Sequence, residues 1–350
     1  MGEGTTVGMD MGDKKHRVCV LDGEGAVKTR GSVVNTAAGI RKYFKEMEGC
    51  RVVLEAGTHS RWVSRIVEEL GHEVLVGNPR KLRMIWQSHE KSDERDAEML
   101  ARIGRLDPQL LYPIHHRGEK TQADLAVIKA RGMLVKSRKM LIAHARGLVK
   151  SMGQRISQCS AKAFHRRLGE EMPEELAPAL EPVRKSIEDL TVRIGEYDKQ
   201  IEQLGGERYP QTEGLRAIVG VGPITSLAFV LTLEDWERFD KSRSVGAYLG
   251  LTCKRDQSGQ TDKQLRISKA GDEAMRVLLV GAAHYILGHF GSDCELRDFG
   301  LKLAQRGGKN AKRRAVVAVA RKLAVLMHHL WKTGAAYDPY YHQNQKKKAA

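Results

Sequence analysis

The sequence predicts an α/β domain followed by an all-α region, and three observations carry that prediction. Three short β-type segments near the N-terminus are followed by alternating helical and β-type segments up to residue 110, which is typical of an α/β domain. Apolar residues then recur with a seven-residue period from about residue 121 to residue 204, as in long packed helices. Beyond residue 211 the periodic segments are again helical and are separated by glycine-containing turns.

In the first region, residues 1–110, strands and helices are expected to alternate after an initial three-stranded stretch. A hairpin turn is expected at DGEG, 22–25. The buried strand that follows the first helix ends at Glu55. The expected strands are 5–11, 16–21, 26–34, 51–57 and 72–77, and the expected helices are 36–47, 59–70, a short one that begins at Pro79, and 93–106 with Met99, Leu100 and Ile103 on one face.

The second region, residues 111–210, is expected to hold two long helices. The first spans 121–152, and the second has nine apolar positions in strict 4-3 spacing from Leu176 to Leu204. This spacing favours an antiparallel or intermolecular coiled coil, with two helices of an ordinary bundle as the alternative. Residues 153–175 are expected to be a looser connection.

The third region, residues 211–335, begins with a helical segment, a tight Gly-Val-Gly-Pro turn at 220–223 and an apolar helix from about Thr225. This order resembles a helix-hairpin-helix. Two more helices are expected at 272–290 and 311–331. Residues 336–350, which include Lys346, Lys347 and Lys348, are expected to be a basic disordered tail.

The charge of the chain points to a polyanionic partner. The 350 residues carry a net charge of +16, distributed as +1 over 1–110, +8 over 111–155, −3 over 156–210 and +10 over 211–350. No apolar run reaches the ~18 residues of a membrane span, and the N-terminus lacks the apolar core of a signal peptide. We therefore expect a nucleic-acid partner rather than a membrane.

The five cysteines form no CxxC pair. A zinc ribbon and a disulfide scaffold are therefore not expected, and reduced thiols in a cytoplasm are the default. For a DNA-bound protein, association with the nucleoid would follow.

Four carboxylates form the first candidate site. Asp10 ends the first strand between two small residues, and Glu55 ends a strand that should neighbour it. Asp93 and Asp96 are three residues apart and share one face of a helix. Two strand-end and two helix carboxylates can form an all-oxygen site for two divalent cations, Mg²⁺ or Mn²⁺. The alternative for each acid alone is a solvated surface carboxylate.

Candidate phosphate contacts lie outside this cluster. The glycines of the Gly-Val-Gly-Pro turn can expose backbone N–H groups, and the next helix points its N-terminus at a phosphate; a plain tight turn is the alternative. The candidate residues for contact with nucleic acid are Lys91, Arg95, Gly220, Gly222, Lys254, Arg255, Arg266, Lys269, Lys312, Arg313 and Arg314.

A serine in a basic, polar stretch is the candidate nucleophile. Ser258 precedes Gly259 between Lys254-Arg255 and Lys263. Cations there would neutralise a phosphate and favour attack on a phosphodiester. Ser268 is a second candidate, although it also fits a helix cap. No acid or histidine beside Ser258 is an evident base, so a Ser-His-Asp triad is not expected.

Together these motifs resemble one family. VGMDMGDKKHRVCVLD, VVLEAGTHSRW and KSDERDA are similar to the RuvC-like DEDD domain of transposases of the insertion sequence 110 and 1111 family. GLRAIVGVGPITSLAFVLTL, FDKSRSVGAYLGL, QSGQ and RISKAGDEAMRVLLVGAAH resemble its C-terminal transposase domain. The resemblance runs from about residue 5 to about residue 332. The helix motif differs in having Ser92 where the family usually has threonine.

The resemblance implies an RNase H-like N-terminal domain and a DNA recombinase that excises and inserts its element. It implies that Asp10, Glu55, Asp93 and Asp96 are ligands of Mg²⁺ or Mn²⁺ and that Ser258 forms a transient phosphoserine with DNA. It also implies a structured bridge RNA that pairs with target and donor DNA, and assembly into a dimer or tetramer.

Two other functions fit the same residues. A RuvC-like nuclease for DNA structures such as Holliday junctions would use only the acids, without a covalent intermediate. A nucleic-acid-binding scaffold with degenerate acids would bind without Mg²⁺-dependent cutting.

Overall fold

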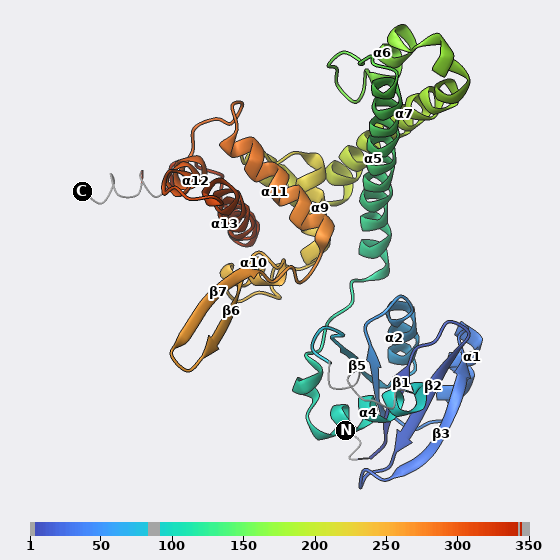
Figure 1. Ribbon diagram of the computed structural model, residues 1–350. Helices are drawn as coiled ribbons and strands as arrows, with labels where there is room; N and C mark the ends of the chain where they lie inside the picture. The colour runs from blue at the N-terminus through green and yellow to red at the C-terminus, as the bar shows by residue number, and fades with distance from the viewer. Residues whose placement is uncertain (1–3, 83–91, 342–343, 345–350) are drawn as a thin grey trace. The chain divides into compact units, whose positions relative to one another are not determined.

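The structure is a computed structural model that describes residues 4–82, 92–341 and 344. The chain forms two units, Met1–Gly118 and Glu119–Ala350. Figure 1 shows a strand-rich first unit and a mostly helical second unit. The prediction of an α/β region followed by a helical region is therefore confirmed.

The first unit is built on a five-stranded mixed sheet of order β3-β2-β1-β4-β5. β1 lies between β2, which is antiparallel to it, and β4, which is parallel to it. β3 continues the antiparallel side and β5 the parallel side. The strands are β1 (Thr6–Asp10), β2 (Lys15–Leu21), β3 (Val27–Val34), β4 (Arg51–Glu55) and β5 (Glu73–Gly77).

Helices cover both faces of this sheet. Val7, Met9, Val52 and Leu54 pack with residues of α1 (Ala37–Lys45) and α2 (Ser60–Glu69) on one face. On the other face α4 (Asp93–Leu106) packs Leu100 and Ile103 against Val53. Because successive residues of a strand alternate in direction, the odd and even positions of β1 meet different helices.

Two details of the first unit differ from the sequence-based expectation. Met99 is 36% exposed, so the buried face of α4 is made by Ala97, Leu100, Ala101 and Ile103 instead. Pro79 begins a turn in which the N–H of Lys81 donates to the carbonyl of Asn78. The rest of the expected short helix lies mainly outside the described residues. A 3₁₀ turn at Pro108–Leu111 follows α4.

Two long antiparallel helices, α5 (Glu119–Ser151) and α7 (Ala177–Arg208), begin the second unit. Arg131 pairs with Asp198 at 2.9 Å and Arg138 donates to Thr191 at 3.1 Å, so residue numbers rise along one helix as they fall along the other. The two helices pair within one chain. Leu180, Ile187, Ile194 and Ile201, one heptad apart, are fully or almost fully buried.

The connection between the long helices is more ordered than expected. It contains α6 (Phe164–Glu171) and a 3₁₀ turn at Glu174–Leu176. Phe164 and Leu168 pack against Ala145, Val149 and Leu180. Because α6 has only eight residues, its amphipathic pattern was too short to distinguish a helix from a loop in the sequence.

The C-terminal helices of the second unit share one core with the near ends of α5 and α7 through Leu125, Ile128 and Ile201. Within the segment expected as a tail, the N–H of Glu295 donates to the carbonyl of Pro339 at 2.9 Å. Lys346, Lys347 and Lys348 lie outside the described residues. The helices are α8 (Gln211–Arg216), α9 (Pro223–Leu233), α10 (Arg243–Tyr248), α11 (Glu273–Leu287), α12 (Glu295–Gln305) and α13 (Ala311–Thr333), of which α10 and α12 were not expected.

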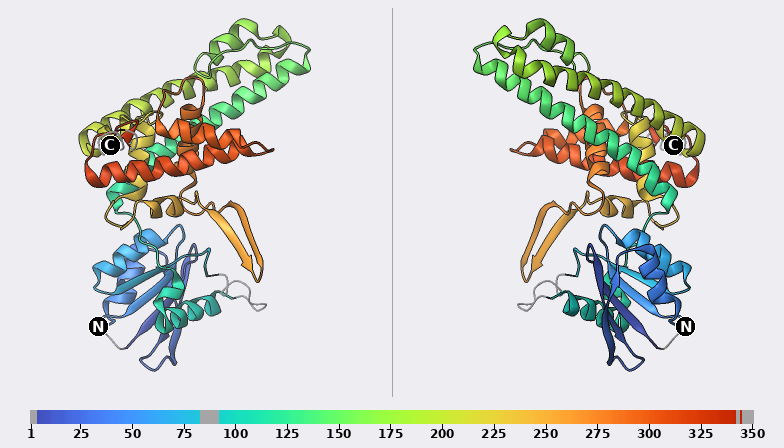
Figure 2. Two further views of the ribbon diagram at one scale, coloured as in Figure 1. Left: turned by 90° about the vertical axis from the view of Figure 1, so that its left-hand side faces the viewer. Right: turned by 90° about the vertical axis from the view of Figure 1, so that its right-hand side faces the viewer.

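A two-stranded hairpin of β6 (Cys253–Ser258) and β7 (Thr261–Ile267) interrupts these helices. Its residues are exposed on both strands apart from the half-buried Ile267. Figure 2 shows it extending away from the helices of the second unit. The sequence indicated only a polar loop here, because neither strand has an apolar face to signal burial.

Candidate functional site

Asp10 and Glu55 end two neighbouring parallel strands. In the register of β1 and β4, Met9 lies opposite Leu54, so the next residue on each strand is one of the two acids. Neighbouring strands lie about 4.8 Å apart. Met9 and Leu54 face α1 and α2, so by alternation both carboxylates belong to the face covered by α4.

Two glycines let α4 lie directly on this face. A Cβ on Gly8 of β1 would come within 1.9 Å of the Ala97 carbonyl oxygen, and one on Gly104 of α4 would come within 2.3 Å of Val53. Arg51, at the start of β4, also donates to the Gly104 carbonyl at 3.1 Å. The C-terminal end of α4 therefore lies near the start of β4, and its N-terminal end points toward the edge that holds Asp10 and Glu55.

Asp93 and Asp96 occupy the first turn of α4, at that same edge. Ser92 caps the helix by accepting a hydrogen bond from the Arg95 N–H at 3.3 Å, as its position before the acidic turn would favour. Asp93 is exposed and Asp96 is half-buried. They precede the buried Ala97 and Leu100 by four residues, which places them on the sheet side of the helix.

The four acids thus share one edge, but they are not gathered into a finished metal centre. Among residues 4–82, 92–341 and 344, no group of three or more histidine, cysteine, aspartate or glutamate side chains is close enough to hold a metal ion. Carboxylates suit hard divalent cations, and like charges at short range repel until a cation neutralises them. The donor chemistry and the placement fit a divalent cation.

One of the basic residues near this edge forms an ion pair. Arg17, which lies opposite Asp10 in the β1–β2 register, reaches Glu94 at 3.9 Å. Arg95 is exposed at the start of α4. Lys91, the other cation expected here, lies outside the described residues.

Ser258 is the last residue of β6, at the turn of the exposed hairpin. It lies opposite Thr261, with Gly259 and Gln260 between them. Gly259 has φ +53°, in the left-handed region that glycine adopts without strain, as two-residue hairpin turns require. The serine is therefore presented at the tip of a protruding ribbon rather than in an enclosed pocket.

The alternation of the hairpin separates its charged groups into two faces. Asp256 and its cross-strand partner Lys263 share the face of Ser258. On the other face, Arg255 makes a bidentate ion pair with Asp262, at 2.7 and 2.6 Å, and this hydrogen-bonded pairing lowers the pKa of the Asp262 carboxyl. Asp256, two residues from the serine, therefore lies on the same face as Ser258, although the sequence alone did not single it out as an evident base.

The base of the hairpin is fixed to the helices by Arg276 of α11. Its Nη1 donates to the carbonyl of Ala270 at 2.5 Å and to that of Gly271 at 3.1 Å. A Cβ on Gly250 would meet the backbone of Ala270 at 2.2 Å. This close backbone packing and the single guanidinium hold the hairpin at its root. This role could not be predicted from the sequence, because Arg276 lies in an ordinary helical pattern.

Ser268, the second candidate serine, lies at this root. Its N–H donates to the Thr252 carbonyl at 2.8 Å, and its hydroxyl accepts a hydrogen bond from the Ala270 N–H at 3.4 Å. It does not cap α11: Asp272 does, accepting from the Met275 N–H at 2.9 Å. The capping interpretation of Ser268 is therefore wrong.

The Gly-Val-Gly-Pro turn joins α8 to α9 as expected. Gly220 has φ +81° and packs against α11, where a Cβ would lie 3.0 Å from the Ala282 carbonyl. Gly222 is exposed, with ordinary backbone angles, and precedes Pro223 at the start of α9. The turn borders a cavity of about 650 Å³ that is also lined by Arg216 and Tyr285.

The remaining expected phosphate contacts are exposed cations of the second unit. Lys254, Arg266 and Lys269 lie on or next to the hairpin, and Lys312, Arg313 and Arg314 follow the start of α13. Arg255 is the exception among them, because Asp262 neutralises it. None of the described helices is both long and apolar enough to cross a bilayer.

Comparison with known families gives matches in both units. A model of the transposase family of insertion sequences IS116, IS110 and IS902 matches residues 212–295. A second model, described as a transposase and named for the DEDD motif and IS110, matches residues 7–153. Together they span the acids, the turn and the hairpin.

Several bacterial proteins are similar along most of the chain. A probable family 20 transposase of Pseudomonas aeruginosa is 26% identical, over 95% of this chain and 98% of its own length. The transposase for insertion sequence element IS1111A of Coxiella burnetii is 27% identical, over 92% and 88%. A pilin gene-inverting protein of Moraxella bovis is 25% identical, over 83% of each chain.

Proposed function

The chain belongs to the IS110-type family of transposases, enzymes that cut and rejoin DNA, and on that premise we propose that it exchanges DNA strands through Ser258 with the help of the four acids. The observation that carries this proposal is the position of Ser258 at the turn of an exposed hairpin. Such an exposed ribbon can reach a phosphodiester of duplex DNA directly, so the DNA does not have to enter a pocket.

In the proposed first step the hydroxyl oxygen of Ser258 attacks phosphorus. The bond from phosphorus to the leaving deoxyribose oxygen breaks, the serine proton passes to a base, and the released oxygen takes up a proton. A phosphoserine–DNA ester and a free hydroxyl end result. Attack by a hydroxyl of the partner strand then reverses these changes and restores serine, so that no energy from outside is needed for rejoining.

The side chains around Ser258 suggest what assists this step. Lys263 shares the face of Ser258 and would neutralise the phosphate. Asp256, which shares that face, is the base that we propose for the serine proton, directly or through one water. Arg276, which holds the root of the hairpin, would keep the serine in a fixed direction.

In this proposal Asp10, Glu55, Asp93 and Asp96 hold one or two Mg²⁺ or Mn²⁺ ions. A divalent ion at this edge would stabilise the negative charge that develops on attacking and leaving oxygens. The chain contributes acids from two adjacent strand ends and from one helix turn that two glycines bring against the sheet. The central antiparallel and parallel strands with helices on both faces support an RNase H-like assignment for this unit.

The partners follow from the family and the charge. Transposases act on DNA, and residues 119–350 carry a net charge of +14 against +2 for residues 1–118. We include in the proposal a guide RNA, a dimer or tetramer of the chain, and the functional division into 1–110, 111–210 and 211–335.

The test is a search for the covalent intermediate. Purified protein is incubated with Mg²⁺, its flanking non-coding RNA and a labelled junction DNA, then denatured in detergent. Label is expected to migrate with the protein, and Ser258→Ala should remove this adduct while leaving DNA affinity unchanged. Ser268→Ala serves as the matched control and should retain the adduct.

Other outcomes distinguish the alternatives. Free cleaved ends without an adduct would assign a RuvC-like nuclease that uses the acids alone. An adduct that persists in Ser258→Ala would exclude this serine. DNA binding without cleavage at any Mg²⁺ concentration, unaffected by Asp10→Asn, would indicate a binding scaffold.

A further inference from the structure

Helix α5 and the connection that follows it carry an unusual run of positive charge. Residues 125–169 contain eleven Lys or Arg residues and no Asp or Glu. The run covers most of α5, the connection after it and most of α6. A solvated helix surface normally interleaves both signs. Lys129, Arg131 and Arg167 pair with acids of this chain that lie outside the run, but the eleven cations outnumber these partners, and the excess favours an anion outside the chain.

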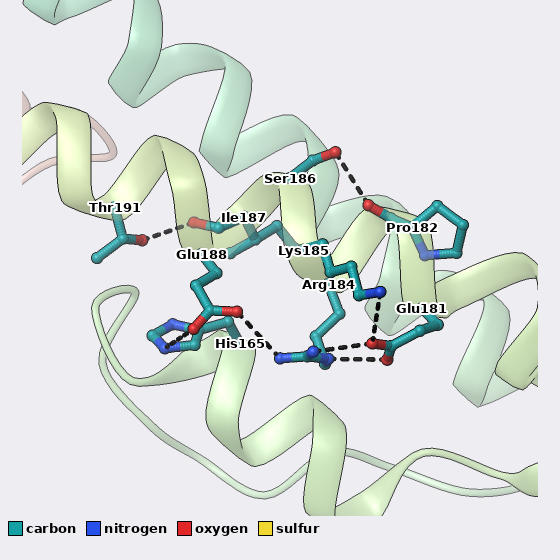
Figure 3. Close-up of polar contacts among 9 residues, drawn as sticks. All are labelled: His165, Glu181, Pro182, Arg184, Lys185, Ser186, Ile187, Glu188 and Thr191. Atoms are coloured by element: carbon teal, nitrogen blue, oxygen red, sulfur yellow. Dashed lines mark hydrogen bonds and ion pairs between the residues drawn. The ribbon is translucent and has the colours of Figure 1, made fainter.

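The partner helix α7 shows the contrasting, balanced pattern. It carries seven acids and five cations, and Figure 3 shows two of these acids and two of these cations in contact. Arg184 lies between Glu181, at 2.8 Å, and Glu188, at 3.3 Å, and Lys185 lies 4.0 Å from Glu181. The excess charge therefore belongs to the α5 side and not to the helical pair as a whole.

The cations at the C-terminal end of α5, which we call its far end because it lies away from the C-terminal core, line a cavity. It has a volume of about 340 Å³ and is lined by Arg146, Lys150, Arg155, Ile156 and Gln158. None of these five residues is acidic, and within the described part of the chain neither Lys150 nor Arg155 takes part in an ion pair. Gln158 adds an amide that can donate hydrogen bonds to a phosphate oxygen.

The cavity walls are held in place by the fold. Ile156 is 6% exposed and packs in one cluster with Phe164 and Val149. The N–H of Ser157 donates to Glu171 at 2.7 Å, and the guanidinium of Arg146 lies 5.1 Å from the centre of the Phe164 ring. The backbone of the cavity and Arg146 are thus held in place, whereas Lys150 and Arg155 are exposed and can turn toward an anion.

We propose that this cavity, the far-end site, binds the phosphate backbone of duplex DNA on which the enzyme acts. Three cations and an amide with no acid suit the oxygens of a phosphate, and a contact made to phosphates is independent of sequence. DNA is the polyanion that a transposase must hold. The inference rests on DNA as the partner, but not on the serine or the acids.

The position of the far-end site gives it a separate role. Ile128 packs in the C-terminal core and Lys150 lies at the cavity, and twenty-two residues of α helix separate them by roughly 33 Å. At 3.4 Å per base pair this is about ten base pairs, or one turn of DNA. The far-end site would thus hold flanking DNA at a distance from the C-terminal core.

The experiment measures the salt dependence of DNA binding by the full chain. Lys150→Gln/Arg155→Gln is compared with Lys185→Gln/Arg193→Gln, which removes equal charge from exposed, paired positions on α7. Each lost phosphate contact lowers the slope of log K against log salt by about 0.9. We expect the first variant to lose about 2 units of slope on a mixed-sequence DNA duplex and the control to lose none.

The outcomes separate this inference from the catalytic proposal. Equal slopes for the first variant and the native chain would overturn the far-end site, as would an equal loss in the control. A loss confined to an RNA duplex of the same length would overturn the choice of DNA. Both variants should still form the Ser258 adduct at low salt, so a missing adduct in the native chain would count against the catalytic proposal alone.

Discussion

At the scale of single residues, burial keeps two histidines of the first unit uncharged. His16 of β2 is fully buried, and burial lowers its pKa, with a smaller contribution from His59. Burial also lowers the pKa of His116 to about 4, helped by Arg61, His115, Arg65 and Arg117. An unfolded chain would bind a proton at each site near pH 6.5, so protonation favours unfolding.

This predicts acid sensitivity of the first unit. A lowered pKa means that stability from the two histidines is complete above pH 6.5 and is lost as the pH falls through the lowered pKa of each, which is about 4 for His116. His16→Leu should flatten the dependence of the free energy of unfolding on pH below pH 6.5, measured by urea denaturation. The control is His144→Gln, at an exposed histidine of the second unit. An unchanged pH slope in His16→Leu would show that His16 is not buried in its neutral form.

At the scale of elements, residues with a strong periodic or turn signal were predicted well, and elements held by other parts of the chain were not. The strands that end at Asp10 and Glu55 are short segments buried on both faces, as expected for central strands, so their neighbourhood followed from the sequence. The β6–β7 hairpin has exposed residues on both faces, and its anchor is Arg276, far along the chain. Such contacts leave no local pattern, so Ser258 was predicted in a loop, and without the strand pairing no acid beside it could be identified as a base.

Packing of α4 on the sheet gives a prediction at this scale. Gly8→Ala would place a Cβ 1.9 Å from the Ala97 carbonyl oxygen, so α4 must move and carry Asp93 and Asp96 with it. We expect a loss of about 1–3 kcal/mol in the free energy of unfolding and a large loss of Mg²⁺-dependent cleavage. Thermal unfolding and strand-exchange assays measure the two effects.

The matched change is Gly132→Ala in α5. A Cβ there meets nothing within 4 Å, and alanine favours a helix interior over glycine by about 0.8–1.0 kcal/mol. This variant should be slightly more stable and fully active. If Gly8→Ala were as stable as the native chain, direct packing of α4 on β1 would be disproved.

At the scale of the whole molecule, the two units differ in net charge and in the candidate residues that they carry. The first unit holds the four acids at one sheet edge and is almost neutral, whereas the second holds Ser258, the Gly-Val-Gly-Pro turn and nearly all of the net positive charge. We expect the second unit to contribute most of the affinity for a DNA duplex, because that affinity rises with the number of phosphates that cations neutralise. Under the proposed function, the acids would act on DNA that the second unit has bound.

This division predicts how separated units behave. Residues 119–350 expressed alone should bind duplex DNA with nearly the salt slope of the full chain, because they carry +14 of the +16 net charge, but should form no adduct if the acids are needed for the serine step. Residues 1–118 should bind DNA weakly and bind Mn²⁺, an effect that Asp10→Asn should reduce. Fluorescence anisotropy and calorimetry measure these affinities. Tight DNA binding by 1–118 alone would mean that contacts at the acid edge, and not net charge, decide how this enzyme holds its substrate.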